Sequence, residues 1–384
     1  MTSATTAPAG VTEVAPSGGI RFPVASRPMV RQSKVDSVSL LAGATSFPPI
    51  SLPATGWVRK ISLLFTVTGA AASAGAVVAG DGPFNLISGI SLSDATGQPI
   101  YQPISGYNLY LVNKYLPGVD CVSPWANNPH MGPEYAYAAT ATTFTATFRL
   151  DLDLEQDART GYGSIPNLDS NASLQLNVSL APYTVAFTGT TVSAVNVGLI
   201  VDQHYWAPIG GTMGGVPVMS RPSGAGDFLE TRYENKTVNA QSENTMDFTN
   251  RGGLIRGLIL VSRAAGVRTD FTAATNVGLV YDNNAQEEGH RYESFRDRMR
   301  RDHGYLGADL TTSYAPLTAG VLPGLDRGVL VWNFDKRAAG RDTWLSTRVG
   351  TLLQAKFTPG ASATTAEVVT QIMQVRDAAT FYGN

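Results

Sequence analysis

Apolar and polar residues alternate with a period of two in several short segments of the chain. The alternating segments span residues 61–68, 148–155, 174–180 and 195–201. Because successive side chains of a strand point to opposite faces, each segment is predicted to be a strand with one buried and one solvated face. Turns rich in Gly, Pro and Asn separate these segments, which favours a sandwich or barrel over alternating strands and helices. The predicted fold class is all-β.

The two halves of the chain resemble each other at four places in the same order. Gly56–Leu64 and Gly253–Val261 each place Gly, an apolar pair and Arg ahead of an apolar strand. The other three pairs are Ile90–Ile100 with Gly278–Glu288, Phe148–Ala158 with Val329–Ala339, and Ser173–Pro182 with Gly350–Pro359. Four ordered matches indicate a duplicated β domain of about 160 residues per copy, enough for eight strands and their loops.

One helical pattern follows the second matched segment in each half, at Pro103–Leu116 and at Arg291–His303. We expect these helices to be equivalent elements, each packing an apolar stripe on its own barrel. The stripe residues expected to be buried are Tyr107, Leu111, Phe295 and Met299.

Shifts in composition predict the domain boundaries. Residues 1–46 are rich in Thr, Ala, Pro and Ser and are expected to form an extended N-terminal arm. Residues 209–226 hold a density of Gly and Pro that neither a helix nor a central strand tolerates, so they are assigned as a linker. The prediction is therefore two tandem eight-stranded jelly-roll barrels, residues 47–208 and 227–384, with a short helix in each.

Charged residues make up only 15% of the chain, against roughly 25% in a typical soluble domain. A surface with so few charges suits a protein largely covered by neighbours. The net charge of −2 supplies no field for nucleic acid, so no specific nucleic-acid partner is expected. Cys121 is the single cysteine, which excludes an intrachain disulfide and fits a reducing compartment. The first 20 residues lack the pattern of a secretory signal.

Candidate catalytic and metal-binding chemistry is sparse. The four His residues, at 130, 204, 290 and 303, never form the paired pattern of a cupin metal site, and no nucleophile or phosphate-loop motif occurs. Asp151, Asp153, Glu155 and Asp157 form the densest acidic run, but Gln156 stands where a calcium loop needs Gly. This run is expected to be a solvated or subunit-facing strand edge. No catalytic residue, cofactor or metal site is assigned, and the chain is not expected to be an enzyme.

The stretch Asp81–Gly118 resembles the corresponding part of tectivirus major capsid proteins. It contains a Gly-Pro-x-Asn-Leu entry to a strand, an Asp turn, and a helix with an aromatic-x-Leu-x-x-Val-Asn run. The matching residues are Gly82, Pro83, Asn85, Leu86, Asp94, Tyr107, Leu109, Val112 and Asn113. Phe148–Ala158 and Ser173–Pro182 are similar to later strands of the same barrel.

The resemblance implies a double jelly roll that forms homotrimers, whose six barrels give a pseudo-hexagonal capsomer. Such capsomers tile an icosahedral shell around an internal lipid membrane. The implied partners are neighbouring capsomers, penton or minor capsid proteins and the membrane. The implied location is the virion, after synthesis in the host cytoplasm.

Two sets of charged side chains are the candidate contact residues of such an assembly. Arg21, Arg27, Arg31 and Lys34 in the arm are expected to face the lattice or the membrane. Arg298 and Arg301 lie in the second helical pattern, where five Arg are balanced by five acidic residues between 287 and 303. These two Arg are expected to face neighbouring capsomers.

A binding module, such as a phage receptor-binding or lectin-like β protein, is the alternative. It would need an exposed aromatic cluster on loops, and Trp125, Tyr135 and Tyr137 could supply one. The duplicated fold without a shaft segment argues against a fibre.

Overall fold

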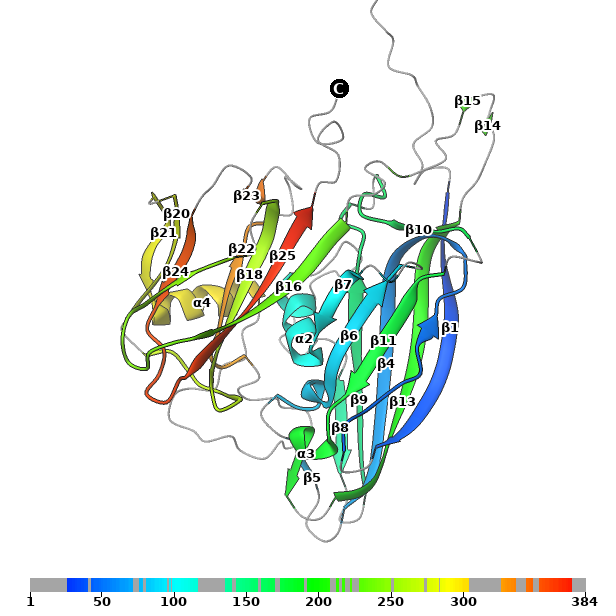
Figure 1. Ribbon diagram of the computed structural model, residues 1–384, viewed down its shortest axis with the longest axis horizontal. Coiled ribbons are helices and arrows are strands. Elements are labelled where there is room, and N and C mark those ends of the chain that lie inside the picture. Colours follow the sequence, from blue (N-terminus) through cyan, green and yellow to red (C-terminus); the bar gives the residue numbers. More distant parts are fainter. Residues whose placement is uncertain are drawn as a thin grey trace, which may run out of the picture.

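The chain folds into two β barrels that stand side by side, with helix α2 between them (Figure 1). This description rests on a computed structural model. It covers residues 26–374 apart from gaps at 41–42, 72–75, 79–80, 95–96, 98, 117–134, 140–142, 158–159, 170–172, 190–191, 208–211, 214–215, 218–221, 223–227, 250–251, 273–274, 283, 304–325, 336–342 and 348–351.

The first barrel consists of two facing antiparallel sheets. The larger sheet has the order β1-β13-β4-β9-β8, with β10 also paired to β4. Its strands are β1 (Arg27–Leu40), β13 (Val192–Ala207), β4 (Gly56–Ala71), β9 (Thr143–Asp153), β8 (Tyr135–Ala139) and β10 (Ile165–Asn167). The second sheet has the order β2-β11-β6-β7, with β3 also paired to β11. Its strands are β2 (Thr45–Ser46), β3 (Ile50–Ser51), β11 (Gln175–Leu180), β6 (Ile87–Ser93) and β7 (Pro99–Ile104).

The second barrel repeats this arrangement. Its larger sheet has the order β16-β25-β18-β19, with β22 and β23 also paired to β18, and its smaller sheet has the order β17-β24-β20-β21. The larger sheet contains β16 (Phe228–Thr237), β25 (Thr365–Gln374), β18 (Leu254–Ala264), β19 (Val267–Arg268), β22 (Val329–Asn333) and β23 (Leu345–Ser346). The smaller sheet contains β17 (Asn244–Asp247), β24 (Leu353–Phe357), β20 (Asn276–Tyr281) and β21 (Asn284–Arg291).

Both barrels have jelly-roll topology. When the eight main strands of a barrel are numbered along the chain, with β2 and β3 sharing one place, its two sheets have the orders 1-8-3-6 and 2-7-4-5. The four matched sequence segments fall on equivalent strands: β4 with β18, β6–β7 with β20–β21, β9 with β22, and β11 with β24. The predicted all-β double jelly roll is confirmed. The match between β9 and β22 differs by one residue from the sequence alignment, because strand pairing makes Asp153 equivalent to Asn333.

The two predicted helices are equivalent elements. Helix α2 (Gly106–Tyr115) follows β7, and α4 (Tyr292–His303) follows β21 at the same place in the second barrel. Helix α2 begins later than predicted because Pro99–Ile104 is a strand and the Ser105 side chain caps the helix by accepting a hydrogen bond from the Asn108 backbone. Tyr107, Leu111, Phe295 and Met299 are all buried. The expectation that the stripe of α2 packs on its own barrel is wrong for Tyr107, because its ring lies against Arg263 and Arg268 of the second barrel. Two further short helices are η1 (Phe84–Leu86) and α3 (Tyr183–Ala186), and a small sheet joins β5 (Ala76–Val78) to β12 (Phe187–Gly189).

The predicted N-terminal arm ends earlier than residue 46, because Arg27–Leu40 forms strand β1. This strand pairs with β13 along its length, from Arg27 opposite Ala207 to Leu40 opposite Val195. Its side chains are mostly exposed, so the hydrophobic pattern that marks other strands is weak here. Residues 1–25 lie outside the described part of the chain. The predicted linker contains a short hairpin of β14 (Thr212–Met213) and β15 (Val216–Pro217).

We expect removal of residues 1–25 to leave thermal unfolding unchanged, whereas removal of residues 1–40 should destabilise the first barrel. The longer deletion removes strand β1, including Leu40, which is buried in the core. Loss of one buried Leu alone costs about 2–5 kcal/mol of unfolding free energy. Denaturation curves of the two truncations test this, and equal stability of both would show that β1 is not part of the barrel.

Candidate assembly interface

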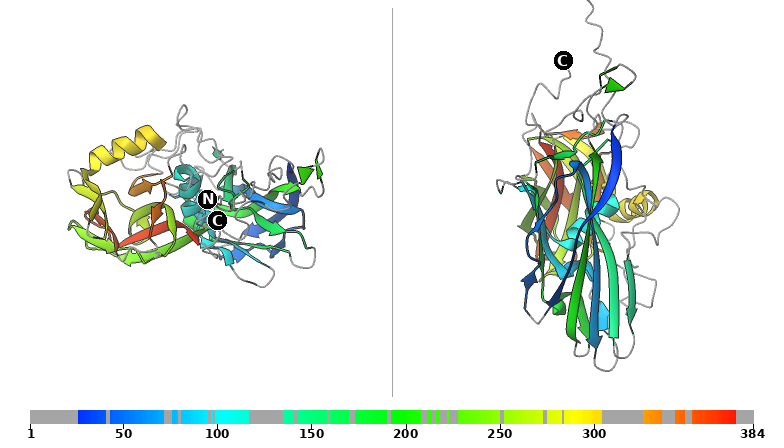
Figure 2. Two further views of the ribbon diagram at one scale, coloured as in Figure 1. Left: turned by 90° about the horizontal axis from the view of Figure 1, so that it is seen from above. Right: turned by 90° about the vertical axis from the view of Figure 1, so that its right-hand side faces the viewer.

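Helix α2 is buried between the two barrels, at the centre of the molecule (Figures 1 and 2). Every residue of the helix except Asn113 is buried. Asn113 binds the backbone of Asp151 in its own barrel, donating to the carbonyl at 2.7 Å and accepting from the amide at 3.0 Å. The opposite side of the helix contacts the second barrel, so the helix belongs to both packing units. One continuous hydrophobic core accordingly includes residues of both barrels.

The C-terminal end of helix α2 packs against the outer face of strand β18. Leu116 lies directly over Gly257, where even a Cβ atom would come within 2.4 Å of the leucine side chain. Ile259 and Val261 on the same face of β18 are fully buried. Strand β18 is therefore covered on both sides, which explains why residues 258–261 form an apolar run where the equivalent strand β4 alternates.

Lys114 of α2 forms a buried ion pair with Asp326 of the second barrel, and neither side chain is exposed. Tyr110 donates a hydrogen bond to the other carboxylate oxygen of Asp326 at 3.3 Å. Burial lowers the pKa of Lys114, while the charge and hydrogen bond of Asp326 act in the opposite direction. Asn108 of the same helix is buried as well.

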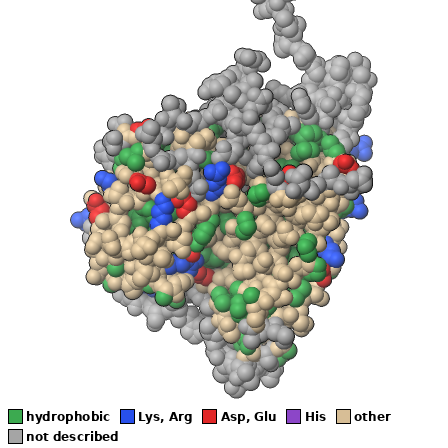
Figure 3. Space-filling model, in the orientation of Figure 1, with side chains coloured by type: hydrophobic (Ala, Val, Ile, Leu, Met, Phe, Trp, Pro, Cys, Tyr) green, Lys and Arg blue, Asp and Glu red, His purple; other side chains and the backbone are tan. Residues whose placement is uncertain are grey.

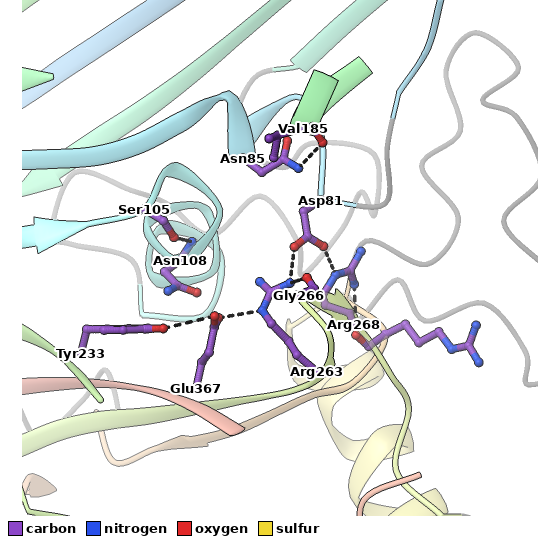
Figure 4. Close-up of polar contacts among 11 residues, drawn as sticks. Asp81, Asn85, Ser105, Asn108, Val185, Tyr233, Arg263, Gly266, Arg268 and Glu367 are labelled. Carbon is purple, nitrogen blue, oxygen red and sulfur yellow. Dashed lines mark hydrogen bonds and ion pairs between the residues drawn. The ribbon is translucent and has the colours of Figure 1, made fainter. Parts of the chain in front are cut away.

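Asp81, in the chain segment that leads into η1, forms a second ionic contact between the barrels (Figure 4). Its carboxylate binds Arg263 at 2.5 Å and also binds Arg268. Both guanidinium groups lie against the ring of Tyr107 in α2, at 5.4 and 4.9 Å from its centroid. Burial alone would raise the pKa of Asp81, but the charges and hydrogen bonds of Arg268 and Arg263 hold it below its usual value.

Arg263 extends the network into the sheet of the second barrel. Its Nε lies 2.8 Å from Glu367 Oε2, and Glu367 accepts a hydrogen bond from Tyr233 at 3.2 Å. Figure 4 shows Arg263 between these groups and Asp81. Arg263 therefore has a carboxylate acceptor on each barrel, Asp81 on the first and Glu367 on the second. This arrangement favours one orientation of the two barrels relative to each other.

An Arg occupies the same β-bulge in each barrel. Arg59 and Arg256 each stand at a register shift between the third and eighth strands. A bulge redirects the side chain of the extra residue. Arg59 pairs with Glu155 at 2.5 Å, and Arg256 pairs with Asp335 at 2.9 Å.

The second of these Arg residues also binds the first barrel of the same chain. Arg256 donates to the backbone carbonyl of Leu116 at 3.1 Å, and Asn333 donates to that of Tyr115 at 3.0 Å. These two bonds hold the C-terminal end of α2 against the second barrel, where carbonyl groups lack partners within the helix.

Asp151, Asp153 and Glu155 of the acidic run are buried within the chain, so their prediction as a solvated or subunit-facing strand edge is wrong, whereas Asp157 is partly exposed. Glu155 pairs with Arg59, and Asp151 pairs with Lys60 at 3.0 Å. These ion pairs could not be predicted from the local sequence pattern, because the basic partners lie on β4, about ninety residues earlier in the chain.

The predicted contact residues do not form one cluster. Arg27, Arg31 and Lys34 lie on the exposed strand β1, and Arg21 lies outside the described residues. Arg301 on α4 is exposed, and Arg298 is partly buried, with its guanidinium 4.7 Å from the ring of Phe295. The interface role of either group remains a prediction.

The visible face of the first barrel is mostly uncharged, with scattered hydrophobic side chains, whereas charges gather over the second barrel (Figure 3).

Among the residues described, no group of three or more His, Cys, Asp or Glu side chains could hold a metal ion. No helix within the described ranges is long and apolar enough to cross a membrane.

The fold is that of virus capsid proteins. The crystal structure of the STIV MCP matches 93% of this chain and 100% of its own length, with a TM-score of 0.61 at 12% identity. The atomic structure of Sulfolobus turreted icosahedral virus contains a chain that matches with a TM-score of 0.60 at 13% identity, over 91% of both chains. The Faustovirus major capsid protein matches 91% of this chain and 90% of its own, with a TM-score of 0.54 at 9% identity.

These solved structures are double jelly-roll major capsid proteins, and the chain shares their fold from the first barrel through the second. No family model matches the sequence, and a search of curated proteins finds no match.

We expect the substitution Asp81→Asn to destabilise the molecule by about 3–5 kcal/mol at neutral pH, because it removes the carboxylate charge that the buried Arg263 and Arg268 share. The wild-type advantage should be complete above pH 3.8, the ordinary pKa of the group, and should disappear as the pH falls through the lowered pKa of the folded state. Denaturation at a series of pH values measures this difference.

Asp36→Asn is the matched control. Asp36 pairs with Lys34 at 3.6 Å on the exposed strand β1, and such surface pairs contribute at most about 1 kcal/mol. Equal effects of the two substitutions would contradict the assignment of Asp81 to a buried barrel junction.

Proposed function

We propose that this chain is the major capsid protein of an icosahedral virus and has no catalytic role. The observation that carries the proposal is the fixed side-by-side docking of two equivalent jelly rolls through α2. The match to capsid proteins over at least 90% of the chain supports it. A shell protein needs rigid building units of regular outline, and two similar barrels in one chain supply such a unit.

The assembly unit of the proposal is a homotrimer. Three copies of a two-barrel chain place six similar barrels around one axis and give a pseudo-hexagonal capsomer. Closed rings of this kind need a head-to-tail contact between copies. The low charge content of the chain, 15%, suits wide contacts between neighbouring capsomers and with penton or minor capsid proteins.

The N-terminal segment is the proposed link to the lattice or to an internal membrane. Arg21 precedes β1, and Arg27, Arg31 and Lys34 lie on that exposed edge strand. Basic side chains attract anionic lipid headgroups. The proposed location of the protein is the virion, after synthesis in the host cytoplasm.

We expect the purified protein to have three times the 40.6 kDa mass of the chain in light scattering at micromolar concentration. At high concentration, electron microscopy should show hexagonal sheets or closed shells. The truncation lacking residues 1–25 serves as a control, because it should keep the trimer and lose shells or vesicle binding. A stable monomer that never assembles would contradict the proposal and favour a binding module.

A further inference from the structure

Lys114 and Asp326 bring an amine and a carboxylate from different barrels into direct contact, away from water. Lys114 lies in the last turn of α2, and Asp326 lies just before β22 of the second barrel. Neither side chain has any exposed surface. Removing two charges from water is costly, and their mutual attraction does not always offset that cost. A reaction that consumes both charges is therefore favoured at this place.

The Tyr110 hydroxyl is a third polar group in contact with this pair. It lies 3.4 Å from Lys114 Nζ and donates a hydrogen bond to Asp326 Oδ1 at 3.3 Å. The amine contacts the other carboxylate oxygen, Oδ2. The rings of Tyr110 and Tyr115 lie 5.8 and 5.4 Å from Nζ. The amine is thus held beside the carboxyl group, and a hydrogen-bond donor is in place at the oxygen that the amine does not contact.

The ionisation of the two groups on α2 suits a reaction between this amine and this carboxylate. Burial lowers the pKa of Lys114 from its usual value of 10.5, even though the charge and hydrogen bond of Asp326 act to raise it. An amine is nucleophilic only in its uncharged form, which this shift favours. Burial also raises the pKa of Tyr110 well above its usual value of 10.0, so the hydroxyl keeps the proton that it donates.

We propose that Lys114 and Asp326 form an isopeptide bond, which joins the two barrels of the chain covalently. The ammonium group transfers one proton to Asp326 Oδ2, which gives an amine and a carboxylic acid. The Nζ lone pair then adds to Cγ, while Tyr110 stabilises the negative charge that develops on Oδ1. Nζ gives up a second proton, the Cγ–Oδ2 bond breaks, and Oδ2 leaves as water with both protons. The third proton stays on the amide nitrogen, so the reaction needs no oxidant, cofactor or further reactant.

Lys60 and Asp151 form a contrasting pair within the first barrel. Their charged groups lie 3.0 Å apart, but each side chain is 12% exposed. Water reaches this pair and stabilises its separate charges, so we expect it to remain ionic. The ion pairs of Asp81 at the barrel junction involve Arg263 and Arg268, whose guanidinium groups do not lose a proton in proteins.

The bond would act once in each chain, as a self-modification after folding and not as a catalytic cycle. It would fix the orientation of the barrels that the other contacts of α2 favour, and it would persist when those contacts are broken. Local opening of the junction would then no longer separate the two barrels. The proposal concerns chemistry within one chain and does not depend on the capsid function.

Tryptic digestion of the purified, denatured protein followed by mass spectrometry tests the bond directly. Trypsin does not cleave after a Lys whose amine is in an amide, so residues 61–149 should stay in one piece. We expect this piece to be joined to the peptide 302–327, with a total mass one water molecule below the sum of the two. Lys114→Arg should abolish the branched peptide, and the matched variant Lys60→Arg should retain it. Separate peptides 61–114 and 302–327 from the wild-type protein would overturn the proposal and leave the capsid function standing.

The substitution Tyr110→Phe separates the reaction from the fold, because it removes the hydroxyl and keeps the buried ring. We expect the branched peptide to form roughly a hundredfold more slowly in this variant, as in other sites that lose one donor to a developing negative charge. Samples taken at intervals after synthesis measure the rate. Equal rates in the wild-type and Tyr110→Phe proteins would overturn the role given to Tyr110.

Discussion

The packing of α2 between the barrels is the constraint on which the rest of the structure depends. A helix buried on almost every side needs partners for its polar groups, and the second barrel supplies them through Lys114–Asp326 and through the bonds from Arg256 and Asn333 to its C-terminal end. Beside the helix, the ion pairs of Asp81 with Arg263 and Arg268 also join the two barrels. Each of these hydrogen bonds and ion pairs depends on the direction in which its two groups approach each other. Together with the close approach of Leu116 to Gly257, they leave one favourable orientation of the barrels.

This constraint explains why two copies of the same fold have diverged in sequence. The outer face of β18 is apolar because α2 covers it, while the outer face of β4 carries Lys60, Ser62, Leu64 and Thr66. The helices differ in the same way: α2 presents Tyr107 and Tyr110 to the second barrel, whereas α4 exposes Glu293, Asp297, Arg300 and Arg301. The differences lie at the outer surfaces of the barrels, whereas the shared strand order and the matched Arg bulge lie within them.

The sequence predicted the strands, the duplication and the helices, because alternation and repeated segments are local signals. It missed β1, whose exposed side chains lack a buried face, and it misplaced Asp151 and Asp153, whose burial depends on segments far away in the chain. One local signal did indicate the junction. The apolar run at residues 258–261 is typical of a strand covered on both faces. The partners Asp81 and Asp326 had no such signal, since an isolated Asp has the same pattern in a loop as in a buried ion pair.

The central claim is that the docking of two equivalent jelly rolls through α2 makes one chain a rigid building unit of a capsid. A cryo-electron microscopy reconstruction of the purified, assembled protein tests it most directly. The account predicts six barrels evenly spaced around a threefold axis, with α2 packed between the two barrels of every chain. A stable monomer that never assembles, or a particle in which α2 does not lie between the two barrels of its chain, would contradict it.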